Sequence, residues 1–214
     1  MQSNDQSFST SVTLDLSIDY RTYLPDGYSE DGAGYPMLMF LHGSGERGTD
    51  LDLLTTATLP KFIENGLDLP FVTVCPQCRE MWYTRSLVAL LDQAIEQYHV
   101  DRSRVYLSGN SMGGLGTWML ADAASDRLAA IVPICAPSSN INPDNFKDLP
   151  VWCFHGAMDS IVPVGESVKM IRRLRAAGCQ VRFTVYPDTD HDSYTPAYHD
   201  PEFVSWLLSH RKAP

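Results

Sequence analysis

The sequence predicts an α/β fold with a mostly parallel central sheet that helices cover on both faces. Short apolar runs alternate with segments of helical periodicity along almost the whole chain, and this alternation is typical of parallel sheets. The run from Pro36 to Leu41 is apolar at every position, as expected of a strand buried on both faces. Because no linker or shift in composition divides the chain, we expect a polar tail over residues 1–10 and a single domain over residues 11–214.

The order of the elements follows from the same periodicity. Apolar and polar residues alternate between Val12 and Asp19, so we expect an antiparallel strand or hairpin over residues 12–24, ended by Pro25-Asp26-Gly27. Further strands are expected at residues 36–41, 71–74, 105–108, 129–135, 151–155 and 180–186, with helices at residues 51–65, 85–99, 112–124, 164–177 and 201–210.

Composition limits the classes of partner and compartment. The 214 residues are 44% hydrophobic and 20% charged, enough to bury a full core. A net charge of −10 disfavours nucleic acid and anionic membranes, so a small-molecule or polymer-linked neutral substrate is expected. Residues 1–10 lack the basic and apolar parts of a signal peptide, which favours the cytoplasm by default or a domain excised from a secreted enzyme. The five cysteines are expected to be buried thiols with at most one or two bridges.

A G-x-S-x-G motif joins strand 105–108 to helix 112–124. It reads Gly109-Asn110-Ser111-Met112-Gly113. Glycine is needed on both sides because larger side chains would collide where the strand turns sharply into the helix. The turn presents the Ser111 hydroxyl, which we predict to be a nucleophile.

A serine nucleophile needs a base, and six histidines compete for that role. His191 follows the last strand and so lies at the same edge of the sheet as Ser111, which makes it the predicted base; His199 is the alternative. His42 and His155 also end strands, but each precedes a glycine in a tight turn, a position more often used to brace a loop.

The base in turn needs a carboxylate that orients it. Asp159 lies in the loop after strand 151–155 and is the predicted acid. Asp190 and Asp192 adjoin His191, and sequence neighbours in an extended chain point apart, so we expect them to be loop charges or turn formers. The chain order Ser111, Asp159, His191 is the order used by one architecture of serine hydrolases.

Oxyanion donors are expected from two places. The first is the backbone N–H of Met112, and the second is a backbone N–H of the glycine-rich loop after strand 36–41, most simply that of Ser44. A phosphate cradle is the other interpretation of this loop, but Gly48-Thr49 lacks the lysine that a P-loop requires.

Trp82, between Met81 and Tyr83, is expected to line a substrate cleft as part of an exposed aromatic patch, or else to pack in the core. The pair Cys75 and Cys78 matches a redox motif, although a structural bridge or buried thiols is the favoured interpretation because the chemistry is assigned elsewhere. No recurring histidine or cysteine pair has metal-ligand spacing, so no metal site is expected.

Together these motifs make the chain similar to the α/β-hydrolase superfamily. The segments starting at His42, Pro76, Ser111 and Ile131 resemble small esterases of the phospholipase/carboxylesterase and polysaccharide-esterase branch, which also resembles prolyl oligopeptidases and dienelactone hydrolases. The resemblance implies hydrolysis of carboxylic esters without a cofactor. Only about fifteen residues separate strands 129–135 and 151–155, where a lid would be inserted, so we expect no large cap and a preference for short-chain or sugar-linked (acetyl or feruloyl) esters. The alternatives are a prolyl-oligopeptidase-like peptidase and a non-catalytic binding domain that kept the fold.

Overall fold

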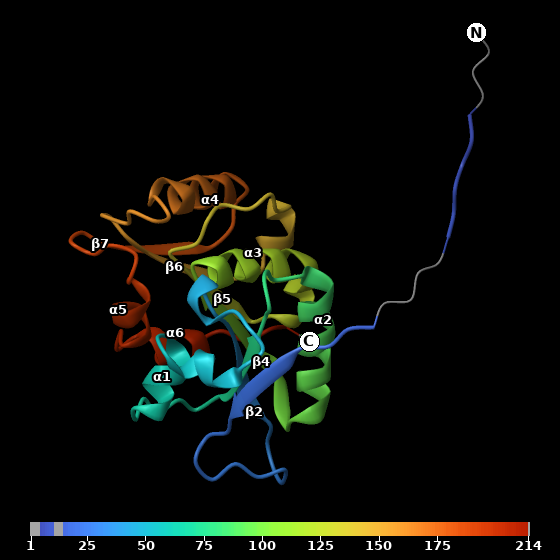
Figure 1. Cartoon of the computed structure of the whole chain (residues 1–214), viewed down its shortest axis with the longest axis vertical. Helices are drawn as coiled ribbons and strands as arrows, with labels where there is room; N and C mark the ends of the chain where they lie inside the picture. Colours follow the sequence, from blue (N-terminus) through green and yellow to red (C-terminus); the bar gives the residue numbers. More distant parts are fainter. Residues whose placement is uncertain (1–4, 11–14, 214) are drawn as a thin grey trace.

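A single seven-stranded sheet organises the computed structural model, which describes residues 5–10 and 15–213 (Figure 1). The strand order is β1-β3-β2-β4-β5-β6-β7, and all neighbouring strands are parallel except β1 and β3. The strands are β1 (Asp19–Tyr23), β2 (Tyr35–Leu41), β3 (Val72–Gln77), β4 (Val100–Asn110), β5 (Ala130–Ile134), β6 (Val151–Gly156) and β7 (Val181–Tyr186). The predicted α/β fold with an antiparallel opening strand is therefore confirmed.

Helices cover both faces of this sheet. The helices are α1 (Leu59–Glu64), α2 (Thr84–Gln97), α3 (Met112–Ala124), α4 (Gly165–Ala176), α5 (Tyr194–Tyr198) and α6 (Phe203–Leu208), with short 3-10 helices η1 (Ser44–Glu46), η2 (Leu51–Thr55), η3 (Ser125–Arg127) and η4 (Pro143–Phe146). Buried side chains of α2, α3 and α4 share one apolar cluster, and those of α1, α5 and α6 share the other. No helix in the described part of the chain is both long and apolar enough to span a bilayer.

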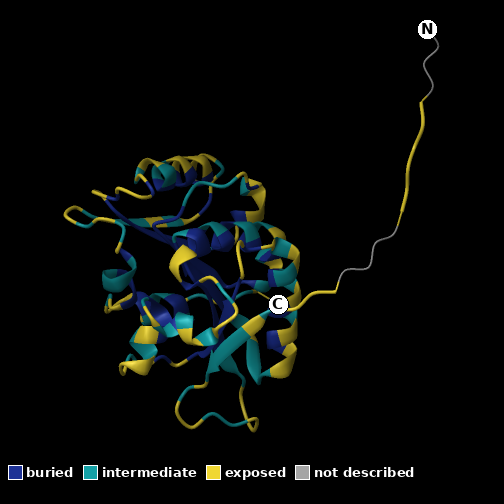
Figure 2. Cartoon of the chain, viewed as in Figure 1, coloured by how far each residue is buried: buried dark blue, intermediate teal, exposed yellow. Residues whose placement is uncertain are grey.

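Strand β2 shows why the sequence produces this layered core. Met37, Met39 and Leu41 belong to the cluster on one face of the sheet, whereas Leu38 and Phe40 belong to the cluster on the other. Successive side chains of a strand point to opposite faces, so an uninterrupted apolar run supplies both clusters at once. Strands β2, β3, β5 and β6 are accordingly buried, whereas the edge strands β1 and β7 are partly exposed, as are the outer faces of the helices (Figure 2).

Several element boundaries differ from the predicted ones. The helix expected at 51–65 is split into η2 and α1, and Asp50 caps the first piece by accepting from the Asp52 N–H. The short helix α5 was not predicted. Regular pairing of β1 starts at Asp19, and residues 11–14 of the expected strand lie outside the described residues.

All five cysteines are free and buried: Cys75, Cys78, Cys135, Cys153 and Cys179. The expectation of buried thiols is confirmed, and none of the five pairs with another in the structure. Burial raises the pKa of Cys75, and it raises the pKa of Cys78 to about 11, so both remain thiols at neutral pH. The C-x-x-C segment is therefore not poised for the thiolate chemistry of a redox pair.

Candidate active site

The turn between β4 and α3 places Ser111 in a left-handed backbone conformation, with φ 56° and ψ −118°. Two close backbone approaches explain the flanking glycines. A Cβ on Gly113 would lie 1.8 Å from the Leu41 carbonyl oxygen, and a Cβ on Gly109 would lie 2.5 Å from the Gly113 carbonyl oxygen. Neither position can hold a side chain without moving the strand or the helix. The collision expected from the sequence is thus present in the structure.

The three side chains selected from the sequence lie in one hydrogen-bonded chain. The Nε2 atom of His191 is 2.9 Å from the Ser111 Oγ. On the other side of the ring, Nδ1 is 2.8 Å and 3.0 Å from the two carboxylate oxygens of Asp159. The Asp159 side chain is fully buried and that of His191 is 23% exposed. The ring can therefore bond the hydroxyl through one nitrogen while the carboxylate fixes the other.

Asp159 is itself held by the loop that carries it. Its Oδ1 accepts from the backbone N–H groups of Ile161 (2.9 Å) and Val162 (2.8 Å). The fully buried His155 lies beneath, with Nε2 2.8 Å from the Val162 carbonyl oxygen and 3.2 Å from the Asp159 Oδ2, and Nδ1 2.7 Å from the Ser167 Oγ. His155 thus braces the acid loop, the role expected of a histidine before a tight turn.

The loop that carries His191 lies directly against the end of β6. A Cβ on Gly156 would lie 2.2 Å from the Asp190 carbonyl oxygen and 2.3 Å from that of Thr189. Asp190 accepts from the backbone N–H of Ser160 (2.7 Å) and from that of His191 (2.8 Å), and the bond from the Ser160 N–H lowers its pKa. Asp190 therefore shapes the turn, and the base receives its bond from Asp159.

Asp192 and His199 lie outside this chain of bonds. Asp192 accepts from the Thr195 N–H at the start of α5 (3.0 Å). The His199 Nδ1 is 2.8 Å from the Thr195 carbonyl oxygen, and its ring packs on Phe62. His199, the alternative base, therefore makes no contact with Ser111 in the structure.

The loop after β2 approaches the turn at Ser111 from the opposite side. A Cβ on Gly43 would lie 3.0 Å from the Asn110 Nδ2, so this glycine permits close contact. Among the described residues, the backbone N–H groups of Ser44 and Met112 donate to no protein acceptor. Both N–H groups are therefore available to an external acceptor, as an oxyanion hole requires.

Buried polar contacts fix this loop. His42 is fully buried, with Nδ1 2.6 Å from the Gly43 carbonyl oxygen, and its Nε2 accepts from the Cys78 N–H at 3.1 Å. Burial lowers the pKa of His42 to about 4, so the ring is neutral at neutral pH. The Glu46 carboxylate accepts from the Thr58 hydroxyl at 2.8 Å, and burial raises its pKa. No sequence pattern predicts the pairing of Glu46 with Thr58, because the two residues meet only through the fold.

Trp82 does not belong to an exposed patch, which corrects that part of the expectation. The side chain is 4% exposed, whereas Met81 and Tyr83 are 44% and 65% exposed. Its indole Nε1 donates to the His42 carbonyl oxygen at 3.2 Å, and the ring faces Gly116 of α3. The hydrogen bond to the loop after β2 and the contact with α3 together bury the indole. The run of three large residues 81–83 does not show which of them makes these contacts.

Cys135 lies behind the candidate triad. Its thiol sulfur and the polar atoms of Asp159 and His191 lie within 4.8 Å of one another. Such a set could in principle hold a metal ion, but burial raises the pKa of the Cys135 thiol to about 12, and the other two side chains are bonded to each other. A metal ligand must be deprotonated and free to turn toward the ion, so the arrangement suits a serine, histidine and aspartate relay better.

The sequence and the fold of this chain are similar to those of several known proteins. The sequence profile of the dienelactone hydrolase family matches residues 77–200. The bifunctional acetylxylan esterase/xylanase XynS20E of Neocallimastix patriciarum is 30% identical over 79 residues, which are 37% of this chain and 12% of that enzyme. A thermostable esterase of known structure superposes with a TM-score of 0.76 at 30% identity, covering 91% of this chain and 59% of that one. A ferulic acid esterase superposes with a TM-score of 0.66 at 18% identity, covering 88% of this chain and 92% of that one, which is a likeness of fold. The chain thus spans only part of the length of the first two relatives.

Proposed function

Because the chain belongs to the dienelactone hydrolase family, a family of hydrolases, we propose that it hydrolyses carboxylic esters with Ser111 as nucleophile, His191 as base and Asp159 as the acid that orients the base. We assign the reaction to a single catalytic domain over residues 11–214. The observation that carries the proposal is the continuous pair of contacts, 2.9 Å from Ser111 Oγ to His191 Nε2 and 2.8 Å from His191 Nδ1 to Asp159 Oδ2.

The chemistry follows from these contacts. His191 Nε2 removes the hydroxyl proton as the Ser111 Oγ attacks the ester carbonyl carbon. The N–H groups of Met112 and Ser44 stabilise the negative oxygen of the tetrahedral intermediate. The protonated His191 then donates to the leaving alkoxide, which leaves an acyl group on Ser111. Water, deprotonated by the same nitrogen, releases the acid and restores the enzyme. Every catalytic group in these steps belongs to the chain, and water is the only other reactant besides the ester. The proposed reaction therefore needs no cofactor.

Short-chain or sugar-linked esters are the proposed substrate class, of the acetyl or feruloyl type. The connection between β5 and β6 holds only η4, and the Phe146 ring of η4 packs on Trp118 of α3, with ring centroids 6.1 Å apart. A connection packed onto the helix layer does not cover Ser111. The bifunctional acetylxylan esterase/xylanase among the similar proteins supports the acetyl type. A small neutral ester also suits a chain with a net charge of −10.

Labelling with a fluorophosphonate probe tests the proposed mechanism. The folded protein should form one adduct, on the peptide that contains Ser111, and Ser111→Ala should form none. Ser108, a buried serine three residues earlier whose hydroxyl donates to the Val132 carbonyl oxygen, supplies the matched control: Ser108→Ala should still label. A folded wild-type protein that resists the probe would contradict the proposal.

A panel of substrates tests the proposed class. Acetylated and feruloylated sugars and 4-nitrophenyl acetate should be hydrolysed, and acylated or prolyl peptides should not. Faster cleavage of the peptides would instead identify a peptidase.

A further inference from the structure

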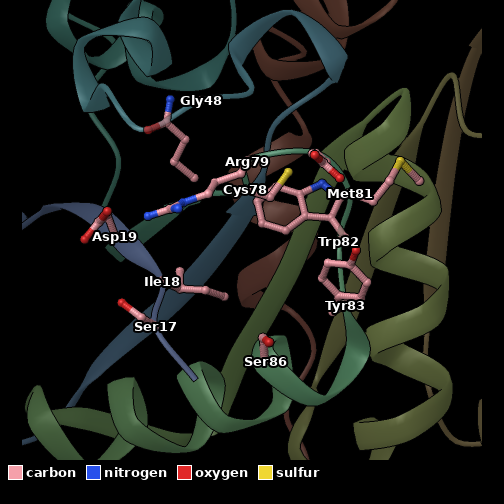
Figure 3. A pocket seen from close by; sticks show the side chains of 12 residues that line it. Ser17, Ile18, Asp19, Gly48, Cys78, Arg79, Met81, Trp82, Tyr83 and Ser86 are labelled. Atoms are coloured by element: carbon pink, nitrogen blue, oxygen red, sulfur yellow. The ribbon is translucent and has the colours of Figure 1, made fainter. Parts of the chain in front are cut away.

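A cavity of about 300 Å³ lies at the side of the sheet, between the start of β1, the end of β3 and the loop that leads into α2 (Figure 3). Its lining includes Asp19, Gln77, Arg79, Trp82 and Tyr83. The volume is at the lower limit of pockets that bind small organic ligands. None of its residues belongs to the proposed triad.

The cavity lies at the same edge of the sheet as Ser111. Asp19 pairs with Gln77 at the carboxyl end of β3, and β3, β2 and β4 are parallel neighbours, so β3 and β4 end at one edge. With a spacing of about 4.8 Å between strands, the end of β3 is roughly 10 Å from the end of β4. A substrate that extends sideways from the Ser111 hydroxyl would reach the cavity.

Trp82 connects the cavity to the candidate oxyanion loop. Its ring lines the cavity, its Nε1 donates to the His42 carbonyl oxygen, and its centroid is 4.7 Å from that of the His42 ring. The same ring lies against Gly116 of α3, the helix that begins after Ser111. The wall of the cavity is therefore fixed by the same elements that position Ser111 and the loop after β2.

The lining combines apolar surfaces with side chains of negative and positive charge that can form hydrogen bonds. Met81 and Tyr83 expose 44% and 65% of their surface, which offers an apolar face to a ligand. Asp19, Arg79 and Glu80 add two carboxylates and one guanidinium. A long acyl chain would leave these charges desolvated and unpaired, and an anion would meet an excess of negative charge. A neutral ligand with apolar ring faces and many hydroxyl groups fits both parts of the lining.

Gln77 provides an acceptor that the protein leaves unpaired. Its Nε2 donates to the carbonyl oxygens of Glu46 (2.9 Å) and Asp50 (2.8 Å), which fixes the amide, while its buried Oε1 has no partner among the described residues. A buried acceptor without a donor is destabilising. The two bonds from Nε2 fix the Gln77 side chain in the wall of the cavity.

From these observations we propose that the cavity binds a sugar ring of a neutral oligosaccharide, next to the sugar that carries the scissile ester. The inference rests on the proposed esterase function and names its alcohol side. The Tyr83 ring packs on the apolar face of the sugar, and Asp19 and Arg79 bond its hydroxyl groups. Binding at a distance from the reacting carbonyl positions the ester and raises kcat/KM for oligosaccharide esters only.

The test compares two substrates with the same acyl group, monoacetylated xylotetraose and 4-nitrophenyl acetate. Tyr83→Ala and Arg79→Gln should each lower kcat/KM for the acetylated xylotetraose about tenfold, mainly through KM, and leave 4-nitrophenyl acetate within twofold of wild type; tenfold corresponds to about 1.4 kcal/mol. Tyr83→Phe should retain the wild-type ratio, because the ring remains. Leu24→Ala is the matched control, since Leu24 is 48% exposed and follows β1 at the opposite edge of the sheet.

The outcomes separate this inference from the proposed function. Hydrolysis of 4-nitrophenyl acetate with no selective loss for the sugar ester in the variants would overturn the cavity and leave the esterase intact. A selective loss of methyl ferulate hydrolysis in Tyr83→Ala would show that an aromatic acyl group occupies the cavity, which also overturns the proposal. If no ester is hydrolysed, calorimetric titration of Ser111→Ala with unesterified xylotetraose decides the matter: binding that Tyr83→Ala removes supports the sugar site, and no binding overturns it.

Discussion

Ser111 keeps a backbone conformation that an L-residue rarely adopts, with φ 56°. Such a conformation costs about 1–3 kcal/mol, and the surroundings hold it in place. The Ser111 N–H donates to the Ile134 carbonyl oxygen (2.9 Å) and its own carbonyl accepts from the Leu115 N–H (3.0 Å). The hydroxyl is thereby directed to His191 by bonds on both sides of the residue.

Replacing the bonded side chains should reduce turnover with different severity. Ser111→Ala and His191→Ala should each lower kcat for 4-nitrophenyl acetate by several orders of magnitude, because the three groups act as a unit. Asp159→Asn should cost somewhat less. His199→Ala is the control and should stay near wild type, since its ring contacts Phe62 and Thr195. Severe loss in His199→Ala with an active His191→Ala would refute the assignment of the base.

His42 should make the fold sensitive to acid. Burial lowers its pKa from 6.5 to about 4 in the folded protein. Between these two pH values His42 is therefore mostly protonated in the unfolded chain and mostly neutral in the folded one. Stability is therefore full above about pH 6.5 and decreases as the pH falls toward 4, by roughly 3 kcal/mol for a shift of this size.

Urea unfolding at pH 7 and pH 4.5 measures this dependence. His42→Asn should be less stable at pH 7, and its free energy of unfolding should change less between the two pH values than that of wild type. The exposed His199→Asn should keep the wild-type dependence, and an unchanged dependence in His42→Asn would contradict the prediction.

At the residue scale, the sequence predicts the approach of residues that lie directly after strands. Ser111, Asp159 and His191 each follow a strand, so the rule that parallel strands end at one edge predicts their approach. The bonds from Glu46 to Thr58 and from His155 to Ser167 and Val162 could not be predicted, because they depend on how loops pack. The burial of Trp82 could not be predicted for the same reason.

Among the elements, the end of β6 and the loop after β7 approach so closely that only glycine fits at 156. Gly156→Ala would push against the Thr189 and Asp190 carbonyls, 2.3 Å and 2.2 Å from the new Cβ, and so displace the turn before His191. A displacement of about 1 Å can lower the rate about 100-fold, so kcat should fall to that extent in a folded protein.

The matched control is Gly165→Ala at the start of α4, where a Cβ has no heavy atom within 4 Å. Its kcat and melting temperature should stay near wild type. Wild-type kcat in a folded Gly156→Ala protein would show that the turn tolerates the methyl group.

Strand and helix lengths were predicted less well than their order. The short run of apolar and polar residues at 105–108 predicts a short strand, yet β4 begins at Val100 because Tyr35 pairs with Val100 past an irregularity in β2. Pairing with a neighbour extended this strand through polar residues such as Arg102, which no periodicity rule includes. α5 was missed for a related reason, since it is only five residues long and contains Pro196.

For the whole molecule, the short connection between β5 and β6 predicts the preferred acyl length. Without a cap, methylenes beyond about six carbons stay in water and gain little of the roughly 0.8 kcal/mol that burial of each could supply. The kcat/KM values of 4-nitrophenyl esters should therefore be highest for about two to six carbons and then decline. A steady rise to long chains, with activation at a lipid interface, would contradict an open site.

The buried thiols can serve as natural probes of local unfolding. Burial raises the pKa of every one of them, and thiol reagents attack the thiolate. Cys75, Cys135 and Cys153 also have no exposed surface, so an alkylating reagent can reach these three only when a segment transiently unfolds. Cys75 lies in β3, Cys153 in β6 and Cys135 directly after β5, which samples the sheet from one side to the other. The alkylation rate at each position, followed by mass spectrometry in the native state, would thus give the local unfolding free energy strand by strand, with no label added and no residue changed.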